Sequence, residues 1–222
     1  MSLLIFDLDG TLIDSKQDIT AQVNRTLAGT GLGPFTEEEV SRCIGRGPEQ
    51  MFDELIRSRA TAMQIQEWVR TYRAFYELNC LKQTELFVGV KRALKHLAPL
   101  KKVVLTNKTQ KLADKILQHF GIESFFEGIY GAEAFYAKKP SPFPVLKVCE
   151  RHGVNTSSTI MIGDSEIDLE AGSLAGTQTI FAAYGYGKLE NAKPWNPAFV
   201  LNSPEDLIHL FSSEKPTFLS TL

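Results

Sequence analysis

The sequence has few cysteines, no excess of either charge and no hydrophobic run long enough to cross a membrane. Its three cysteines among 222 residues lie far apart and form no CxxC pair, so we expect small buried thiols in a reducing compartment. The 24 basic and 26 acidic residues give a formal net charge of -2, which argues against nucleic-acid and membrane-surface partners. Asp7 interrupts the N-terminal apolar run, which is not typical of a secretory signal, so we expect a cytoplasmic protein.

What remains is an ordinary globular composition. Hydrophobic residues make up 43% of the chain and charged residues 23%, which is typical of a soluble protein. The length suits one large domain or two smaller ones. We expect a monomer or a homodimer.

Short apolar runs alternate with helical patterns along most of the chain. These runs show little polar alternation, as expected for strands covered on both faces, and they predict a parallel, doubly wound α/β sheet. Helical spacing of apolar residues predicts the intervening helices at 88–98, 109–120 and 142–153. The predicted strands are residues 3–8, 102–107, 128–132, 159–164, 178–183 and 198–202.

Residues 15–83 break this alternation, because they contain helical patterns and no convincing strand. Thr36 and Glu39 form a capping-box pattern that predicts one helix start, and two further helical patterns follow it. We therefore predict a discontinuous α/β core, made of residues 1–14 and 84–222, with an inserted all-α domain at 15–83. Residues 212–222 are expected to be poorly ordered or loosely docked.

Polar side chains follow several of the predicted strands at the point where each strand ends. In open parallel sheets, ligands bind beyond these carboxyl ends. The chain therefore brings polar groups from four segments to one edge of the sheet. These groups are Asp7, Asp9, Gly10 and Thr11, then Thr106 and Asn107, then Lys138 and Lys139, then Asp164, Ser165 and Asp168.

Several carboxylates in one cleft repel one another and need a cation or a shared proton. Carboxylate oxygens suit Mg²⁺, which often joins substrate phosphate, and a lysine adds positive charge. These parts match phosphoryl transfer, in which positioning and charge stabilisation dominate. Asp7 could attack phosphorus, Asp9 could move the proton, and Gly10 would let the backbone turn tightly beside the phosphate. Helix N-capping is an alternative for Thr106 and Asn107 and for Asp164 and Ser165, and it is compatible with phosphate chemistry.

The chain resembles the haloacid dehalogenase superfamily of phosphotransferases. The DxDGT signature stands at residues 7–11, and the second motif is Thr106 in VVLTNK. The third motif is Lys139 in KKPSPFP, where Pro140 selects this lysine over Lys138, and GDSxxDxxAG stands at 163–172. All four occur in the order of the family and span essentially the whole chain. The resemblance implies a Rossmann-like core with a helical cap that closes over the site.

The resemblance also implies a role for the residues that match its motifs. Asp7 would be the nucleophile and a ligand of Mg²⁺, and Asp9 would be the general acid and base, its carbonyl also binding the metal. Thr106 would hold the phosphoryl group, and Lys139 would neutralise charge between the nucleophile and the phosphate. Substrate contacts would also come from Gly10, Thr11 and Asn107. Asp164 would bind Mg²⁺, and Asp168 would assist directly or through water.

Within the superfamily the chain is most similar to phosphoglycolate phosphatases, through residues 43–52, 87–97, 139–146 and 182–187. In such relatives the position of Gly45, Arg46 and Gly47 is a loop that faces the substrate. Arg46 could pair with a second anionic group of the substrate, and a solvated loop cation is an equally open interpretation.

These observations predict a Mg²⁺-dependent phosphatase that hydrolyses a small, phosphoglycolate-like phosphate monoester through an aspartyl phosphate. The presence of Asp9 favours phosphate chemistry over dehalogenation, because a dehalogenase has no phosphate leaving group to protonate. A sugar phosphomutase similar to β-phosphoglucomutase, or a pyrophosphatase, is the alternative enzyme. A catalytically silent binding or regulatory protein with the same fold is the alternative from another class.

Overall fold

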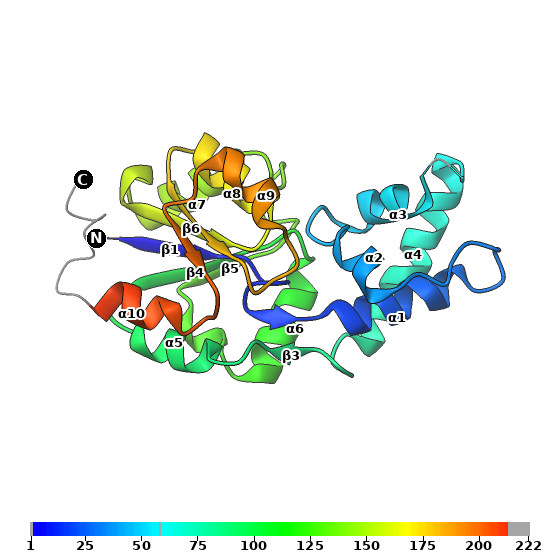
Figure 1. The fold of residues 1–222 in the computed structure, drawn as a ribbon, viewed down its shortest axis with the longest axis horizontal. Coiled ribbons are helices and arrows are strands. Elements are labelled where there is room, and N and C mark those ends of the chain that lie inside the picture. The colour runs from blue at the N-terminus through cyan, green and yellow to red at the C-terminus, as the bar shows by residue number, and fades with distance from the viewer. Residues whose placement is uncertain (1, 58, 213–222) are drawn as a thin grey trace.

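The computed structural model of the protein describes residues 2–57 and 59–212. Its centre is a parallel sheet of six strands in the order β5-β4-β1-β6-β7-β8 (Figure 1). All six predicted strands are confirmed. Strands β1, β4 and β6 end directly before Asp7, Thr106 and Asp164, so that these residues lie in loops beyond the sheet. The strands are β1 (Leu3–Phe6), β4 (Lys101–Leu105), β5 (Gly128–Tyr130), β6 (Thr159–Gly163), β7 (Gln178–Ala182) and β8 (Phe199–Leu201).

Helices cover both faces of the sheet, as the uniformly apolar strands predict. Along β1, Leu4 and Phe6 point into one buried cluster, whereas Leu3 and Ile5 point into another. The first cluster contains side chains of α5 (Val90–His96), α6 (Gln110–Phe120) and α10 (Asp206–Ser212). The second contains those of α7 (Phe143–His152) and α8 (Glu166–Leu174). The doubly wound α/β prediction is therefore confirmed.

Short elements complete the core. The predicted helix at 109–120 ends where Gly121 adopts a left-handed conformation with φ 59°, and Gly153 does the same after α7 with φ 62°. The remaining helices of this part are α9 (Leu189–Ala192) and the 3₁₀ turns η1 (Glu123–Phe125), η2 (Thr156–Ser158) and η3 (Lys193–Trp195).

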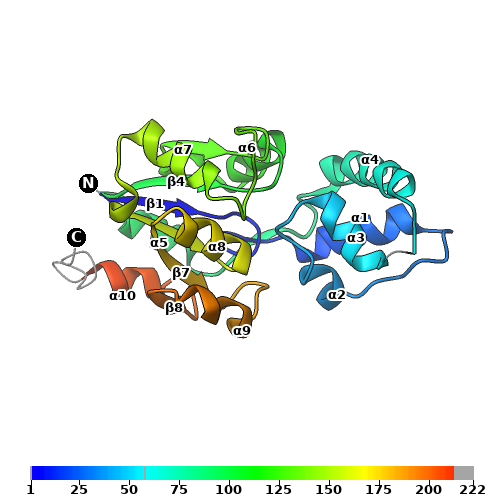
Figure 2. The ribbon, with the colours of Figure 1, turned by 90° about the horizontal axis from the view of Figure 1, so that it is seen from above.

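The segment between Asp14 and Glu85 forms a helical unit at the end of the molecule away from α10 (Figures 1 and 2). It contains α1 (Lys16–Leu27), α2 (Glu37–Ser41), α3 (Pro48–Ile56) and α4 (Ala62–Asn79). The predicted capping box of Thr36 and Glu39 is confirmed at the start of α2. The chain leaves and re-enters the core through two short strands, β2 (Ile13–Asp14) and β3 (Glu85–Leu86), which pair antiparallel.

Helix α1 has no counterpart in the three helical patterns found in the sequence. Several of its buried positions are polar, including Asp18, Thr20 and Gln22, and this blunts the apolar periodicity that signals a helix. The helix persists because Ile19, Val23 and Leu27 belong to the same buried cluster as Tyr72 and Tyr76 of α4. Tertiary packing therefore decides its conformation.

Asp18 joins the two crossings between the helical unit and the core. Its side chain is only 1% exposed. The carboxylate accepts hydrogen bonds from the backbone N–H groups of Gln83 (3.0 Å) and Thr84 (2.9 Å), and from the Thr84 hydroxyl (2.8 Å). The start of α1 is thereby tied to the segment that leads into β3.

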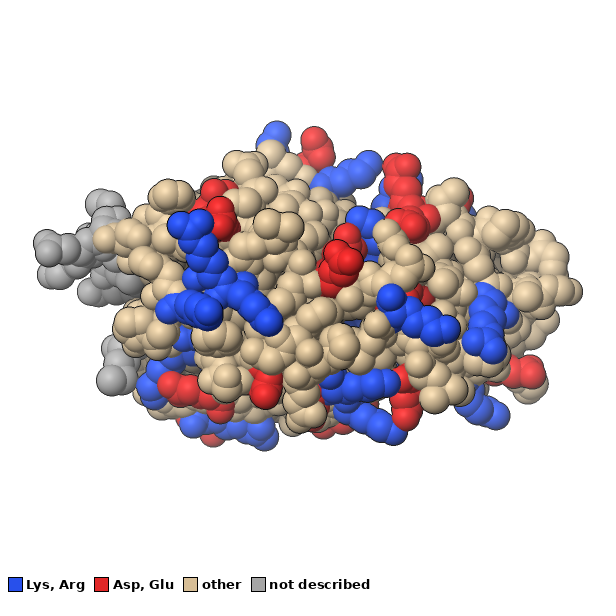
Figure 3. Space-filling view, turned by 90° about the horizontal axis from the view of Figure 1, so that it is seen from below, with Lys and Arg blue, Asp and Glu red and all other residues tan. Residues whose placement is uncertain are grey.

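Basic and acidic side chains share the face of the molecule shown in Figure 3, over both the core and the helical unit. None of the helices within 2–57 and 59–212 is long and apolar enough to cross a membrane. Residues 213–222 lie outside the described part of the chain, so the expectation for the C-terminal tail stays a prediction. The domain limits at 14/15 and 83/84 also stay predictions.

Candidate active site

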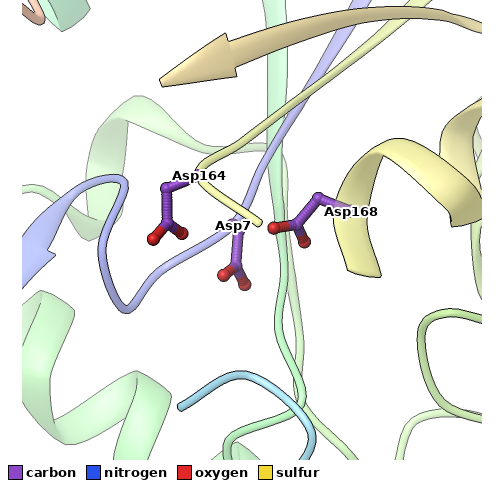
Figure 4. A group of neighbouring side chains, drawn as sticks. All are labelled: Asp7, Asp164 and Asp168. Atoms are coloured by element: carbon purple, nitrogen blue, oxygen red, sulfur yellow. The ribbon is translucent and has the colours of Figure 1, made fainter. Parts of the chain in front are cut away.

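Three buried aspartates meet beyond the carboxyl edge of the sheet. Asp7 follows β1, Asp164 follows β6, and Asp168 lies in the first turn of α8. One carboxylate oxygen of each lies within 4.8 Å of those of the other two, and Figure 4 shows the three side chains facing a common space. The parallel topology brings together residues that are about 160 positions apart because neighbouring strands end at the same edge.

Lys139 is the cation of this cluster. Its ammonium lies 2.8 Å from Asp7 Oδ1 and 2.6 Å from Asp168 Oδ1, and its side chain is 2% exposed. Burial raises the pKa of Asp7 from 3.8 to about 7, although Lys139 opposes that rise. Burial alone would lower the pKa of Lys139, but the carboxylates of Asp168 and Asp7 together raise it. Lys138, by contrast, is exposed, so the choice of Lys139 over its neighbour agrees with its burial.

Asp164 is held by the turn that follows Asp7 and by a loop after β7. Its two oxygens accept hydrogen bonds from the Thr11 hydroxyl (3.3 Å) and the Tyr186 N–H (2.8 Å). Burial and the nearby carboxylates raise its pKa well above the usual range. Gly10 is required beside it, since its φ is +83° and a Cβ there would lie 2.2 Å from Asp164 Oδ2. At Gly185, a Cβ would lie 2.2 Å from the Gly10 carbonyl oxygen.

Asp168 has protein partners at both of its oxygens. Oδ1 pairs with Lys139, and Oδ2 accepts hydrogen bonds from the backbone N–H (3.2 Å) and hydroxyl (2.6 Å) of Ser165. Ser165 is the residue that caps α8. The alternative of an N-cap at Asp164 or Ser165 therefore applies to Ser165, and Asp164 is left to face the cluster.

Asp9 lies apart from the three clustered aspartates and has its own set of donors. Its Oδ1 accepts a 2.5 Å hydrogen bond from the Ser15 hydroxyl and lies 3.0 Å from the ammonium of Lys108. The same ammonium lies 3.0 Å from the hydroxyl of Tyr76, which belongs to α4. The side chain of Asp9 is 10% exposed and that of Lys108 is 6% exposed. Lys108 thus links Asp9 of the core to Tyr76 of the helical unit.

Thr106 and Asn107, predicted as substrate contacts, make different hydrogen bonds within the protein. Thr106 is buried and its hydroxyl accepts a hydrogen bond from the Lys108 N–H (3.1 Å). It does not cap α6, whose N-cap is Thr109. The Asn107 amide donates to the carbonyls of Gly45 (2.8 Å) and Lys139 (2.8 Å). Asn107 therefore bridges the core to the loop of the helical unit.

A cavity of about 100 Å³ lies between the core and the helical unit. Gly45 and Gly47 border it, as predicted for a loop that faces the substrate. Arg46 does not border it: its guanidinium lies 3.3 Å from Glu166 and 3.7 Å from Glu54, and it faces a second cavity of about 340 Å³. The first cavity is lined by Asp7, Asp9, Ile19, Cys43, Ile44, Gly45, Gly47, Pro48, Met51, Tyr72, Arg73, Tyr76, Thr106, Asn107, Lys108, Thr109, Leu112, Ala132, Glu133 and Lys138.

Sequence reasoning missed several residues that shape this site. Lys108 is the last residue of the VVLTNK stretch that contains the second motif, and that position was its only signal. Tyr76 was interpreted as part of an aromatic core stripe; it is 2% exposed and also borders the cavity. Ser15 and Tyr186 gave no signal that could be separated from loop polarity, although Tyr186 lies in the 182–187 segment.

The fold and the buried acidic centre together define an α/β enzyme core whose site lies between the sheet edge and an inserted helical unit. The chain belongs to the haloacid dehalogenase-like hydrolase family, whose model matches residues 4–182. The predicted superfamily resemblance is thereby confirmed, and the protein is a hydrolase of this family.

Relatives and solved structures agree with this family. A phosphoglycolate phosphatase of Aquifex aeolicus is 34% identical over 215 residues, covering 96% of this chain and 98% of the relative. One from Vibrio parahaemolyticus is 31% identical, covering 95% and 96%. The crystal structure of a predicted phosphoglycolate phosphatase from Haemophilus somnus superposes with a TM-score of 0.87 at 26% identity, covering 94% of this chain and 97% of that one.

Proposed function

We propose that this hydrolase is a phosphatase that cleaves a small phosphate monoester, of the size and charge of phosphoglycolate, through an aspartyl phosphate on Asp7. The observation that carries the proposal is the pairing of the buried Lys139 ammonium with Asp7, which borders the small cavity together with Asp9. Relatives that are named phosphoglycolate phosphatase support both the chemistry and the substrate class.

The donor set fits Mg²⁺. Asp7 and Asp164 are buried carboxylates whose repulsion is only partly offset by Lys139, and hard oxygen ligands are what this ion prefers. We assign these two side chains and the Asp9 carbonyl to the ion. Asp168 would act indirectly, because both of its oxygens already accept hydrogen bonds. When bound, Mg²⁺ would supply charge neutralisation for the phosphate oxygens.

In the first step, a carboxylate oxygen of Asp7 forms a bond to phosphorus as the ester P–O bond breaks. The leaving oxygen takes a proton from Asp9, so that an alcohol departs instead of an alkoxide. Lys139 orients the nucleophilic carboxylate and offsets the charge between it and the phosphate. The Thr106 hydroxyl would hold a phosphoryl oxygen.

In the second step, the Asp9 carboxylate takes a proton from water, and the water oxygen bonds to phosphorus. The bond from Asp7 to phosphorus breaks, which releases inorganic phosphate and restores the Asp7 carboxylate. One aspartate is thus the nucleophile in the first step and the leaving group in the second. The other is acid first and base second, as microscopic reversibility requires.

The helical unit at 15–83 would be the cap that helps to select the substrate. The cavity of about 100 Å³ is lined by residues of both the core and this unit, so side chains of both parts would contact the substrate. A sugar phosphomutase and a pyrophosphatase stay the alternative functions.

The proposal is tested by a panel of phosphoglycolate, sugar phosphates, nucleoside monophosphates and pyrophosphate with Mg²⁺, in which kcat/KM and the products are measured. We expect free phosphate, the largest kcat/KM for a two- or three-carbon ester, and no turnover by Asp7→Asn. Asp53→Asn, at an exposed position of α3, is the matched control and should retain activity. Turnover by the Asp7 variant, or an isomerised sugar phosphate as product, would contradict the proposal.

We also propose that the enzyme works in the cytoplasm as a monomer or homodimer, without a nucleic-acid or membrane partner. The near-neutral net charge of -2 supports the absence of a nucleic-acid or membrane-surface partner. Sedimentation of the purified protein, with and without added duplex DNA, tests the oligomeric state and the absence of a nucleic-acid partner.

A further inference from the structure

Lys108 occupies a position that the four motifs do not account for. It lies between Asn107 and the start of α6, and its side chain is 6% exposed although it carries a charge. A lysine ammonium is buried to this extent only where strong partners replace its water. Two such partners are present, one from each side of the cavity: the carboxylate of Asp9 and the hydroxyl of Tyr76.

The core-side partner is held by two donors at the same oxygen. Asp9 Oδ1 lies 3.0 Å from the Lys108 ammonium and 2.5 Å from the Ser15 hydroxyl. Charge-assisted hydrogen bonds of this kind fix both the distance and the orientation of a carboxylate. Since both donors take Oδ1, the plane of the carboxylate is set and Oδ2 is the oxygen that can exchange a proton with the substrate.

The partner from the helical unit is rigid. The ring of Tyr76 stacks on that of Tyr72 with centroids 5.4 Å apart, and Tyr72 in turn packs edge-on against Phe52. Lys108 lies 4.6 Å from the centroid of the Tyr76 ring in addition to contacting its hydroxyl, so a cation–π interaction adds to the hydrogen bond. The lysine is therefore anchored to the packed interior of the helical unit.

We propose that Lys108 is a positioning residue that orients Asp9 toward the leaving oxygen, and that Tyr76 completes this orientation when the helical unit lies against the core. The proposal rests on the function proposed above for Asp9. If α4 separates from the core, Lys108 loses its contact with Tyr76. The orientation of the Asp9 carboxylate, which Lys108 helps to fix, then becomes less defined. Proton donation is then efficient only in the closed arrangement, when the cavity is shut off from bulk water.

A residue that positions Asp9 should affect substrates whose leaving group needs a proton more than substrates whose leaving group does not. A purely structural residue should affect both kinds equally. An alkoxide leaving group needs the proton of Asp9, whereas acetate leaves without one. Ethyl phosphate and acetyl phosphate are similar in size and carry no carboxylate, so they differ mainly in this need. The parameter kcat/KM reports the steps up to departure of the leaving group and excludes the later attack of water.

The experiment measures kcat/KM of the full chain with Mg²⁺ for ethyl phosphate, acetyl phosphate and phosphoglycolate, in the parent protein and in Lys108→Met. General acid catalysis contributes about 10²- to 10⁴-fold, so partial loss of its orientation should lower kcat/KM for ethyl phosphate by about 10- to 100-fold. For acetyl phosphate the expected loss is below about threefold, since no proton is needed. Tyr76→Phe keeps the ring and removes the hydroxyl, and it should shift the ratio in the same direction by a smaller factor.

Lys111→Met is the matched control. Lys111 also pairs with a residue of α4, Glu77, but it does so at the surface and away from Asp9. Its loss should leave the ratio of the two substrates unchanged. If Lys108→Met fails to fold, as judged by circular dichroism, Tyr76→Phe carries the test alone.

Equal losses for ethyl and acetyl phosphate would overturn the proposal, because they would indicate a general structural role. A loss confined to phosphoglycolate would overturn it too, and would make Lys108 a receptor for the substrate carboxylate. Failure of the underlying function is distinguishable, because the parent protein would then turn over none of these phosphate compounds.

Discussion

The carboxylate of Asp18 is expected to be a principal stabiliser of the connection between core and helical unit, and Asp18→Ala tests this. The substitution removes the acceptor of the Gln83 and Thr84 N–H groups and of the Thr84 hydroxyl. The hydroxyl can rotate toward another acceptor, but the backbone donors cannot. Thr84 is buried, whereas Gln83 is exposed, so water can replace the lost bond at Gln83 more easily than at Thr84.

The expected loss of unfolding free energy depends on the burial of the two N–H groups that lose their acceptor. Stranding a buried donor costs about 1 to 3 kcal/mol, so we assign about 2 kcal/mol to the Thr84 N–H and about 1 kcal/mol to that of Gln83. The sum is about 3 kcal/mol of unfolding free energy. For a chain of this length, each kcal/mol shifts Tm by about 2 to 4 °C, so a decrease of about 6 to 12 °C is expected.

Urea denaturation and calorimetry measure the global loss, and hydrogen exchange measures the local one. The Thr84 amide should exchange about 30-fold faster in Asp18→Ala, which corresponds to its assigned 2 kcal/mol. Asp53→Ala, at an exposed position of α3, should change stability by less than about 0.5 kcal/mol. A global loss below about 1 kcal/mol, with unchanged exchange at Thr84, would refute the reasoning.

Three further predictions concern the site and the helical unit. Gly10→Ala should lower kcat by about 100-fold or more in a folded protein, because the new Cβ would lie 2.2 Å from a carboxylate oxygen, and circular dichroism separates this from unfolding. Arg46→Ala and Glu166→Ala should have matching effects on KM, since the two residues pair with each other; lost substrate discrimination in the arginine variant alone would instead assign Arg46 to the substrate. Hydrogen bonds from the Thr36 backbone and side chain hold the pKa of Glu39 below 4.5, so the stability that Glu39 contributes should be complete above that pH and be lost as the pH falls through its lowered pKa. Denaturation of the parent protein and Glu39→Gln across this range should show the two curves converging in acid.

The sheet and the positions of the motif residues could be predicted because each rests on a local pattern. A run such as residues 159–164 is apolar because both of its faces are covered. Neighbouring parallel strands end at the same edge of the sheet, so the topology brings Asp7 close to Asp164. The burial of Lys139 could be anticipated only through its motif. Its pairing with Asp168 then follows from their adjacency in the fold.

The partners of Arg46 and Lys108 could not be predicted, because they depend on contacts between the core and the helical unit. The place of Arg46 in a glycine-flanked loop left two interpretations open, a substrate cation and a solvated loop cation, and neither predicts its pairing with Glu166 of the core. No pattern in the sequence singles out Lys108, and its burial depends on contacts with Asp9 and with Tyr76 of α4. No spacing along the chain encodes such pairs, since they depend on how a helical unit rests on a sheet edge.

The ribbon of β2 and β3 has a consequence for protein engineering and for evolution. Asp14 and Glu85 face each other as paired residues, so the two ends of the inserted segment are already adjacent in space. A two-residue Asn-Gly turn could join them as a hairpin and would leave the register of the six-stranded sheet untouched. Residues 15–84 thus form an insertion that could be exchanged as a unit. A lineage can lengthen, shorten or replace it, and so change what reaches the catalytic groups, while the strands that place those groups keep their pairing.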